Sequence, residues 1–141
     1  MDINELKQIL IKSWSRETCS PGLREKWSEE NPSLGQCAIT AMIVKDALGG
    51  KIMRCMTSTG SHYYNIINDE IVDLTVEQFL GEIPRYEEGS ERTMEYLLSN
   101  EDTKKRYLML VNEVAHYIIL ARSIKIEKTI KEIKVREKKK K

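Results

Sequence analysis

The sequence predicts a single α+β domain, in which a buried helix packs on a small antiparallel sheet and a long C-terminal helix follows. Three observations support this prediction. The chain has 141 residues, which is a usual length for one domain. A segment that is apolar nearly all round precedes three short strand-like segments, and helical spacing of apolar residues returns in the last third. We expect residues 1–124 to form the domain and residues 125–141 to form a basic helical tail.

The first expected helix covers residues 2–15. Asp2 and Glu5 have the D-x-x-E spacing that is typical of a helix start. The apolar residues of this segment recur at helical spacing: Leu6, Ile9, Leu10 and Trp14. Residues 16–32 contain a Pro–Gly and an Asn–Pro step, so we expect them to be mostly loop.

The second expected helix is the buried one. Ser33 and Gln36 have the S-x-x-Q spacing of a capping box, which predicts Ser33 as the N-cap and places Cys37 at the end of the first turn. The helix is expected to run to Leu48, because Gly49–Gly50 follow and would end it. Its side chains are apolar nearly all round, and such a helix is normally buried in the middle of a domain.

Three short strands are expected next, at residues 51–57, 62–67 and 70–74. Asn68–Asp69 is a plausible hairpin turn between the last two strands. With this turn, Tyr64 is expected to face Asp73 across the hairpin.

The remainder of the chain is expected to be mostly helical. Residues 75–78 have a second capping-box pattern, which predicts a short helix through Leu80. Residues 81–90 contain two Gly and a Pro and are expected to form a loop. Residues 91–99 and 102–137 are expected to be helices, the second of them long.

Charge is distributed unevenly along the chain. Residues 125–141 contain nine Lys or Arg and three Glu, a net charge of +6, and because the whole chain is +1 the rest is −5. No aromatic residues interleave with these lysines, so we expect a solvated end and no nucleic-acid partner. Ile126, Ile130 and Ile133 recur within this tail, and an exposed apolar stripe is unfavourable. We expect it to be buried against the body or against a second copy, which would give a homodimer through the C-terminal helix.

Other features limit the location and the cofactors. The sequence contains no run of about 18 apolar residues, so no membrane span is expected. The N-terminus also lacks a signal-peptide pattern. We therefore expect a cytoplasmic protein. The cysteines are Cys19, Cys37 and Cys55, an odd number without a C-x-x-C motif. This pattern argues against a disulfide framework or a metal site, and we expect no cofactor.

Cys37, His62 and Asp73 form a candidate catalytic triad. In the first turn of a helix, Cys37 would feel the positive end of the helix dipole, which favours the nucleophilic thiolate. The expected hairpin places His62 and Asp73 on one face of the sheet as diagonal neighbours. A thiol, a base and a carboxylate that orients the base are the parts of a cysteine-nucleophile site. Each residue also has an alternative role: Cys37 as a buried structural thiol, His62 as a structural histidine and Asp73 as a helix-capping residue.

A cysteine nucleophile also needs hydrogen-bond donors for the oxyanion of its tetrahedral intermediate. The sequence offers the backbone N–H of Cys37, the side-chain amide of Asn31 and the indole N–H of Trp27. The alternative roles are a turn residue before Pro32 for Asn31 and a core anchor for Trp27. Three more residues are expected near the site: Gln36, Tyr64 and Asn65.

The segments around the triad resemble the transglutaminase-like branch of the papain-like superfamily. The resemblance lies in residues 35–41 (GQCAITA), 61–65 (SHYYN) and 72–75 (VDLT). That branch has a G-x-C motif at a helix start, a His that opens a strand and an Asp in a D-x-T context on the next strand. The chain departs from it at Ala38, where the branch has an aromatic residue shortly after the cysteine, and in its shorter gap between Cys and His.

The chain is similar, more closely, to small bacterial proteins of the YunG-like family over about residues 10–110. The shared positions are Trp27, Asn31–Pro32, Gly35–Gln36–Cys37, Leu48–Gly49–Gly50, Ser61–His62–Tyr63 and Asp73–Leu74–Thr75.

The expected function is acyl chemistry through a Cys37 thioester, either hydrolysis or transfer, on an amide or ester of a small molecule or peptide. In this reaction His62 would act as base and then as acid, and Asp73 would orient it. Two alternatives belong to other classes. One is a catalytically silent binding domain on the same scaffold, and the other is an interaction module that uses the long C-terminal helix.

Overall fold

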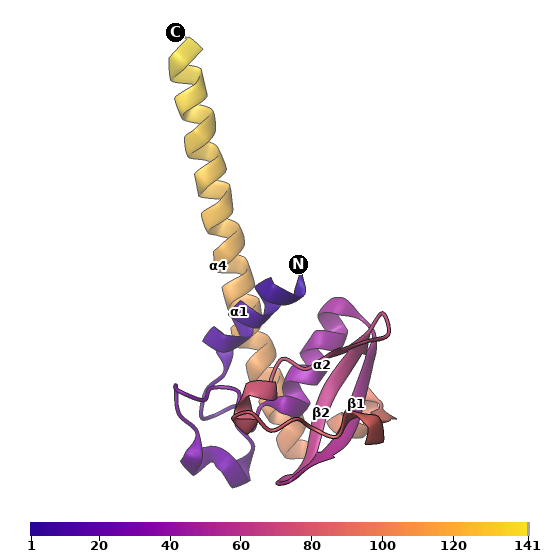
Figure 1. The fold of residues 1–141 in the computed structure, drawn as a ribbon. Helices are drawn as coiled ribbons and strands as arrows, with labels where there is room; N and C mark the ends of the chain where they lie inside the picture. Colours follow the sequence, from indigo (N-terminus) through magenta and orange to yellow (C-terminus); the bar gives the residue numbers. More distant parts are fainter. Residues whose placement is uncertain (141) are drawn as a thin grey trace.

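The structure is a computed structural model that describes residues 1–140. It confirms an α+β fold with a small antiparallel sheet and a long C-terminal helix (Figure 1). The helices are α1 (Ile3–Ser13), α2 (Cys37–Leu48), α3 (Met94–Leu98) and α4 (Glu101–Lys140), and the short 3-10 helices are η1 (Pro21–Lys26), η2 (Val76–Phe79) and η3 (Tyr86–Glu88). The strands are β1 (Lys51–Thr57), β2 (Gly60–Ile67), β3 (Glu70–Val72) and β4 (Ser90–Arg92).

The sheet is antiparallel, with the strand order β3-β2-β1-β4. Asn65 pairs with Val72 across the β2–β3 hairpin, which is the register that the sequence predicts. The turn residues Asn68 and Asp69 have φ angles of 51° and 63°, the pair of positive values that a two-residue type I′ hairpin needs. The ladder ends at Val72, two residues earlier than expected, so Asp73 leaves the sheet directly after the last paired residue.

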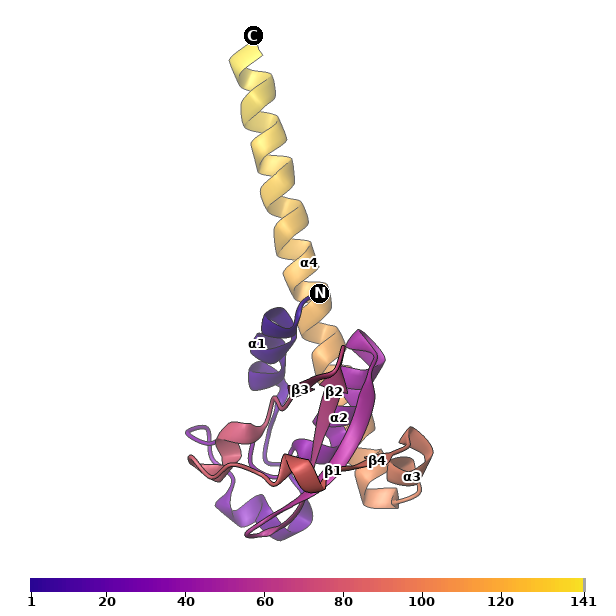
Figure 2. The ribbon, with the colours of Figure 1, turned by 45° about the vertical axis from the view of Figure 1, so that its right-hand side comes forward.

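Helix α2 lies at the centre of the core. It packs against β2 and α4, and α4 also packs against α1 (Figure 2). The side-chain amide of Asn65 donates to the carbonyl oxygen of Ala41 at 2.9 Å, which ties β2 to the first half of α2. The fully buried core residues come from α1, α2, β1 and α4: Leu6, Leu10, Ile39, Met42, Val44, Ile52 and Leu110.

The start of α2 differs from the expected capping box. The helix begins at Cys37 with Gln36 as N-cap, and neither Ser33 nor Gln36 makes a capping hydrogen bond. The Gln36 side chain instead accepts from the Thr18 hydroxyl at 2.8 Å and donates to the carbonyl of Ser15 at 2.9 Å. Ser33 donates to the carbonyl of Thr75. Ser33 and Gln36 therefore hydrogen-bond to loops distant in the sequence and do not form the expected capping box.

Two other expectations were wrong in detail. Residues 90–92 are a fourth strand paired with β1, not loop and helix, and the helix that follows begins at Met94. In the segment 75–78, the Gln78 amide donates to the Thr75 hydroxyl, its oxygen accepts from the backbone N–H of Gly35 rather than from that of Thr75, and a 3-10 helix forms.

Helix α4 runs without interruption from Glu101 to Lys140, and only its first half packs on the body (Figure 1). Its buried side chains are Arg106, Leu110 and Val114, and from Ile119 to Lys140 every residue is exposed. Of the two alternatives expected for the isoleucines of the tail, burial against the body of the same chain is therefore excluded, and pairing with a second copy stays a prediction. No helix within residues 1–140 is both long enough and apolar enough to span a membrane.

Candidate active site

Cys37 is the first residue of α2, and it is partly exposed to solvent. The first amides of a helix have no partner within the helix and point their N–H groups outward. A sulfur atom at this position therefore lies at the positive end of the helix dipole. The other two cysteines, Cys19 and Cys55, are buried.

His62 lies on β2 with a fully buried side chain. Its Nε2 atom is 2.7 Å from Oδ2 of Asp73, so the hydrogen bond to the carboxylate holds a proton on Nε2. The other ring nitrogen, Nδ1, is buried and has no hydrogen-bond partner among the described residues. The Cys37 thiol approaches the ring closely enough to act on its charge, without completing a regular hydrogen bond to Nδ1.

The electrostatics of His62 favour the imidazolium. Burial lowers the pKa of His62, but the hydrogen bond to Asp73 and the contact with Cys37 outweigh burial and raise the pKa to about 9. At neutral pH the ring is therefore protonated on both nitrogens. A buried N–H without an oxygen acceptor is costly, and a Cys37 thiolate is the negative neighbour that can offset this cost.

Both oxygens of Asp73 accept hydrogen bonds. Oδ1 accepts from the backbone N–H and the hydroxyl of Thr75 at 3.3 and 3.4 Å. Oδ2 accepts from His62 and from the Tyr86 hydroxyl, each at 2.7 Å. Asp73 therefore both shapes the turn into η2 and orients His62. Tyr86 was missed at the sequence level, because it lies in a loop that carries no motif.

Aromatic side chains surround the imidazole. Phe79 contacts it edge-on with ring centroids 4.7 Å apart, and Tyr64 stacks with the centroids 6.3 Å apart. The Tyr64 hydroxyl donates to the carbonyl of Tyr86 at 3.1 Å. A Cβ atom on Gly89 would lie 2.0 Å from that hydroxyl, so only glycine fits there. The rings shield the imidazole from water, and Tyr64 holds the loop that carries Tyr86.

Cys55 lies directly opposite His62 on β1. Burial, together with the negative charge of Asp73, raises the pKa of Cys55 to about 11. Although it lies beside His62, Cys55 therefore stays a neutral thiol at neutral pH.

The remaining predicted site residues have structural contacts. The indole N–H of Trp27 donates to the carbonyl of Pro32 at 2.9 Å, which leaves Trp27 with no second N–H for an oxyanion. The Asn31 amide donates to the carbonyl of Gln78 at 3.4 Å, and its second N–H is free to bind another group. Gln36 and Asn65 are buried and fix the loop before α2 and the contact of α2 with β2.

A small pocket of about 250 Å³ lies beside the first turn of α2. It is lined by Ala38, Tyr63, Tyr96, Leu97, Ser99, Asn100 and Thr103. Its lining is uncharged, with polar and aromatic groups. Within residues 1–140, no three His, Cys, Asp or Glu side chains are grouped so that they could hold a metal ion.

A known protein family matches the part of the chain that contains all of the site residues described above. The family described as YunG protein matches residues 2–118. The chain is 39% identical over 100 residues to "Uncharacterized protein YunG" of Bacillus subtilis (strain 168), a match that covers 71% of this chain and 83% of the relative. No solved structure gives a significant match. The YunG-like resemblance expected from the sequence is thus confirmed, and the chain belongs to the YunG family.

Proposed function

We propose that the protein is a cysteine-nucleophile hydrolase or acyltransferase that acts on an amide or ester through a Cys37 thioester. The main support for this proposal is the set of contacts made by the two ring nitrogens of His62. One ring nitrogen is bound to Asp73 at 2.7 Å, while the other is buried without a partner on a ring that also contacts Cys37. This is the arrangement that moves a proton between a thiol and a leaving group.

The proposed reaction starts from the Cys37 thiolate and the His62 imidazolium. The sulfur attacks the acyl carbon, a C–S bond forms, and the carbonyl oxygen becomes an oxyanion near the first amides of α2. His62 then gives its Nδ1 proton to the departing amine or alcohol as the C–N or C–O bond breaks. Water or a second nucleophile attacks the thioester, His62 takes its proton, and the C–S bond breaks to release the acyl product.

The size of the pocket next to Ala38, the residue that follows Cys37, favours a small acyl group. The pocket of about 250 Å³ beside α2 is below the usual range for drug-sized ligands. Its uncharged lining by Tyr63, Asn100 and neighbouring residues suits an uncharged polar group rather than an ionic one. We therefore propose a small-molecule acyl donor, or the side chain of a peptide.

We further propose that this site is related to the transglutaminase-like branch of the papain-like superfamily. The support is the order of the parts: a cysteine that opens a helix, a histidine on a strand and an aspartate just after the next strand. Three free cysteines fit a reducing compartment such as the cytoplasm, where Cys37 would stay reduced.

A chromogenic acyl ester such as p-nitrophenyl acetate tests this function. We expect acetylation of Cys37, seen by mass spectrometry of the intact chain and its peptides, and a burst of p-nitrophenol. His62→Gln should slow the burst by a factor of about 100 or more, as for loss of a general base. His116→Gln is the matched control, because His116 is exposed on α4. An unacetylated Cys37 in a folded protein, or equal bursts in both variants, would contradict the proposal.

A second candidate is a binding domain that keeps the scaffold without catalysis. The observation that favours it is that the small pocket is lined by Ala38 and not by Cys37 itself. A folded chain that binds a small ligand in this pocket, without acylation of Cys37, would support this reading.

A further inference from the structure

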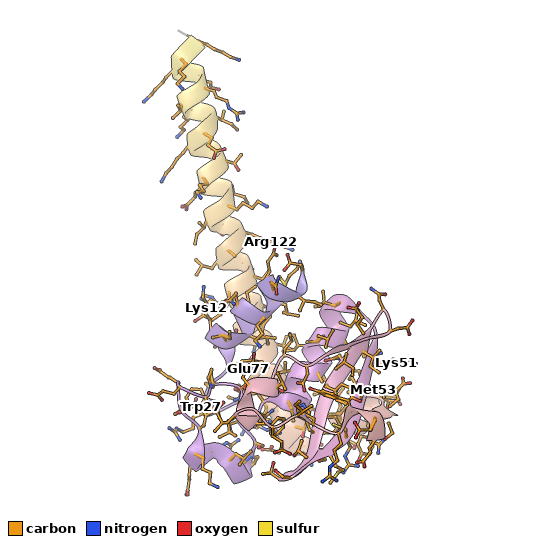
Figure 3. All side chains as sticks on the ribbon, in the orientation of Figure 1. Lys12, Trp27, Lys51, Met53, Glu77 and Arg122 are labelled. Atoms are coloured by element: carbon orange, nitrogen blue, oxygen red, sulfur yellow. The ribbon has the colours of Figure 1, made fainter. Side chains whose placement is uncertain are left out.

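The outer half of α4 has an apolar stripe that no other part of residues 1–140 covers. Four isoleucines form it: Ile119, Ile126, Ile130 and Ile133, with exposed fractions of 65%, 60%, 45% and 47%. We call these four residues the isoleucine stripe. Figure 3 shows the helix beyond Arg122 projecting from the body with side chains on all sides.

The stripe has the geometry of a coiled-coil seam. Its members are spaced by seven, four and three residues, the spacing of the a and d positions of a heptad. At about 100° per residue, all four fall within an arc of roughly 60°. So narrow an arc is typical of a seam between two helices, whereas a helix that lies on lipid needs a wider apolar face.

The body does not obstruct the stripe. The side chains that α4 buries against the body are Arg106, Leu110 and Val114, and the helical spacing places them on the opposite side of the helix. A second helix can therefore lie along the stripe while both bodies point outward.

We propose that the isoleucine stripe pairs with the same stripe of a second copy, in a parallel two-helix coiled coil. This proposal is independent of the proposed enzyme function. Ile119, Ile126 and Ile133 take the d positions of the heptad and Ile130 takes an a position. In this frame Arg122 is at position g and Glu127 is at the following position e. Parallel pairing brings Arg122 of each copy to Glu127 of the other, which gives two attractive flanking pairs. Neither residue forms an ion pair among the described residues.

Charge also distinguishes this arrangement from the alternatives. Antiparallel pairing would place Arg122 near Arg136 of the other copy, which is repulsive. Parallel pairing still brings together two tails of net charge +6, and salt screens that repulsion. The dimer should therefore strengthen as salt increases, whereas binding of the tail to an anionic polymer should weaken.

The interface is short, at about two heptads, and belongs with weak, reversible ones. Sedimentation of the full chain over a range of concentrations should show a monomer–dimer equilibrium. Its dissociation constant should fall by about threefold or more between 50 mM and 500 mM NaCl. Ile126→Asp should abolish the dimer, while Ile124→Asp should leave it intact, because Ile124 is 55% exposed but faces away from the stripe.

The parallel orientation has its own test. Ser123 lies at an a position within the stripe, so Ser123→Cys in a Cys37→Ala background should form a disulfide with its own copy under mild oxidation by copper phenanthroline. Lys128→Cys, on the opposite face of the helix, is the control and should not cross-link.

Three results would overturn the proposal. One is a chain that remains monomeric at every concentration and salt. Another is equal loss of the dimer in the Ile126→Asp and Ile124→Asp variants. The third is a monomer whose tail binds single-stranded RNA or anionic vesicles with an affinity that falls as salt rises.

Discussion

Tyr86 and His62 donate to the same carboxylate oxygen, Oδ2 of Asp73, and each hydrogen bond is 2.7 Å long. The two donors come from different parts of the fold, His62 from β2 and Tyr86 from the η3 loop. The charge that Asp73 presents to the imidazole is therefore shared with a phenol. This relationship makes the proton affinity of His62 sensitive to a loop outside the triad.

Tyr86→Phe should raise the pKa of His62. Without the phenolic hydrogen bond, more of the Asp73 charge acts on the imidazolium. Stability should fall by about 1.5–3 kcal/mol, because a hydrogen bond to a charged group is lost. A ¹H–¹³C NMR titration of the two histidines measures the pKa, and urea unfolding measures the stability. A His62 pKa that falls in this variant would contradict the shared-charge interpretation.

Asp73→Asn should lower the pKa of His62 from about 9. Burial, which opposes the charged ring, is then no longer outweighed by the carboxylate. The same NMR titration checks this, with the exposed His116 as the internal reference. If the protein unfolds instead, Asp73 is primarily a structural residue that holds Thr75, and Thr75→Val would then share the defect.

The contribution of His62 to stability should depend on pH. Its pKa is raised on folding from 6.5 to about 9. The resulting stabilisation is therefore fully present below about pH 6.5 and is lost as pH rises through about 9, with a size of the order of 3 kcal/mol. The difference in unfolding free energy between the wild type and His62→Gln should shrink from pH 6 to pH 10. A difference that grows over this range would have the wrong sign.

Cys37 should be the reactive thiol of the three. Cys19 and Cys55 are buried, and burial raises the pKa of both. Iodoacetamide at pH 6.5, followed by peptide mapping, should label Cys37 at least about tenfold faster than either of the others. Comparable labelling of Cys55 would show that the site opens far enough to expose β1.

Deletion of residues 125–141 should leave Cys37 labelling unchanged and alter only self-association. The deleted residues that the structure describes are exposed and contact no part of the site. Labelling rates and light scattering of the full and truncated chains measure the two effects separately. A truncated chain that stays folded but loses Cys37 reactivity would show that the tail helps to build the site.

Local patterns predicted the parts of the site that short-range geometry controls. The turn at Asn68–Asp69 fixes the register of the β2–β3 hairpin, so the contact between His62 and Asp73 follows from the period-two alternation of a strand. The apolar sequence of α2 likewise predicted its burial.

Long-range contacts explain what the sequence did not predict. Gln36 turns away from its helix because Thr18 and Ser15 supply better partners. Strand β4 is a short polar edge strand, Ser90–Arg92, without the β-branched or aromatic residues that signal strands. Tyr86 reaches Asp73 only because η3 folds back over the sheet, which no local motif encodes.

The absence of a side chain at Gly89 has a consequence for natural variation. The Tyr64 hydroxyl occupies the space that any Cβ atom at this position would need, and that hydroxyl holds the backbone of Tyr86. A single added methyl group would displace Tyr64, then the phenol of Tyr86, and through Asp73 it would change the protonation of an imidazole that it never touches. A lineage that lost this glycine would therefore change the protonation of His62 while retaining all three residues of the candidate triad.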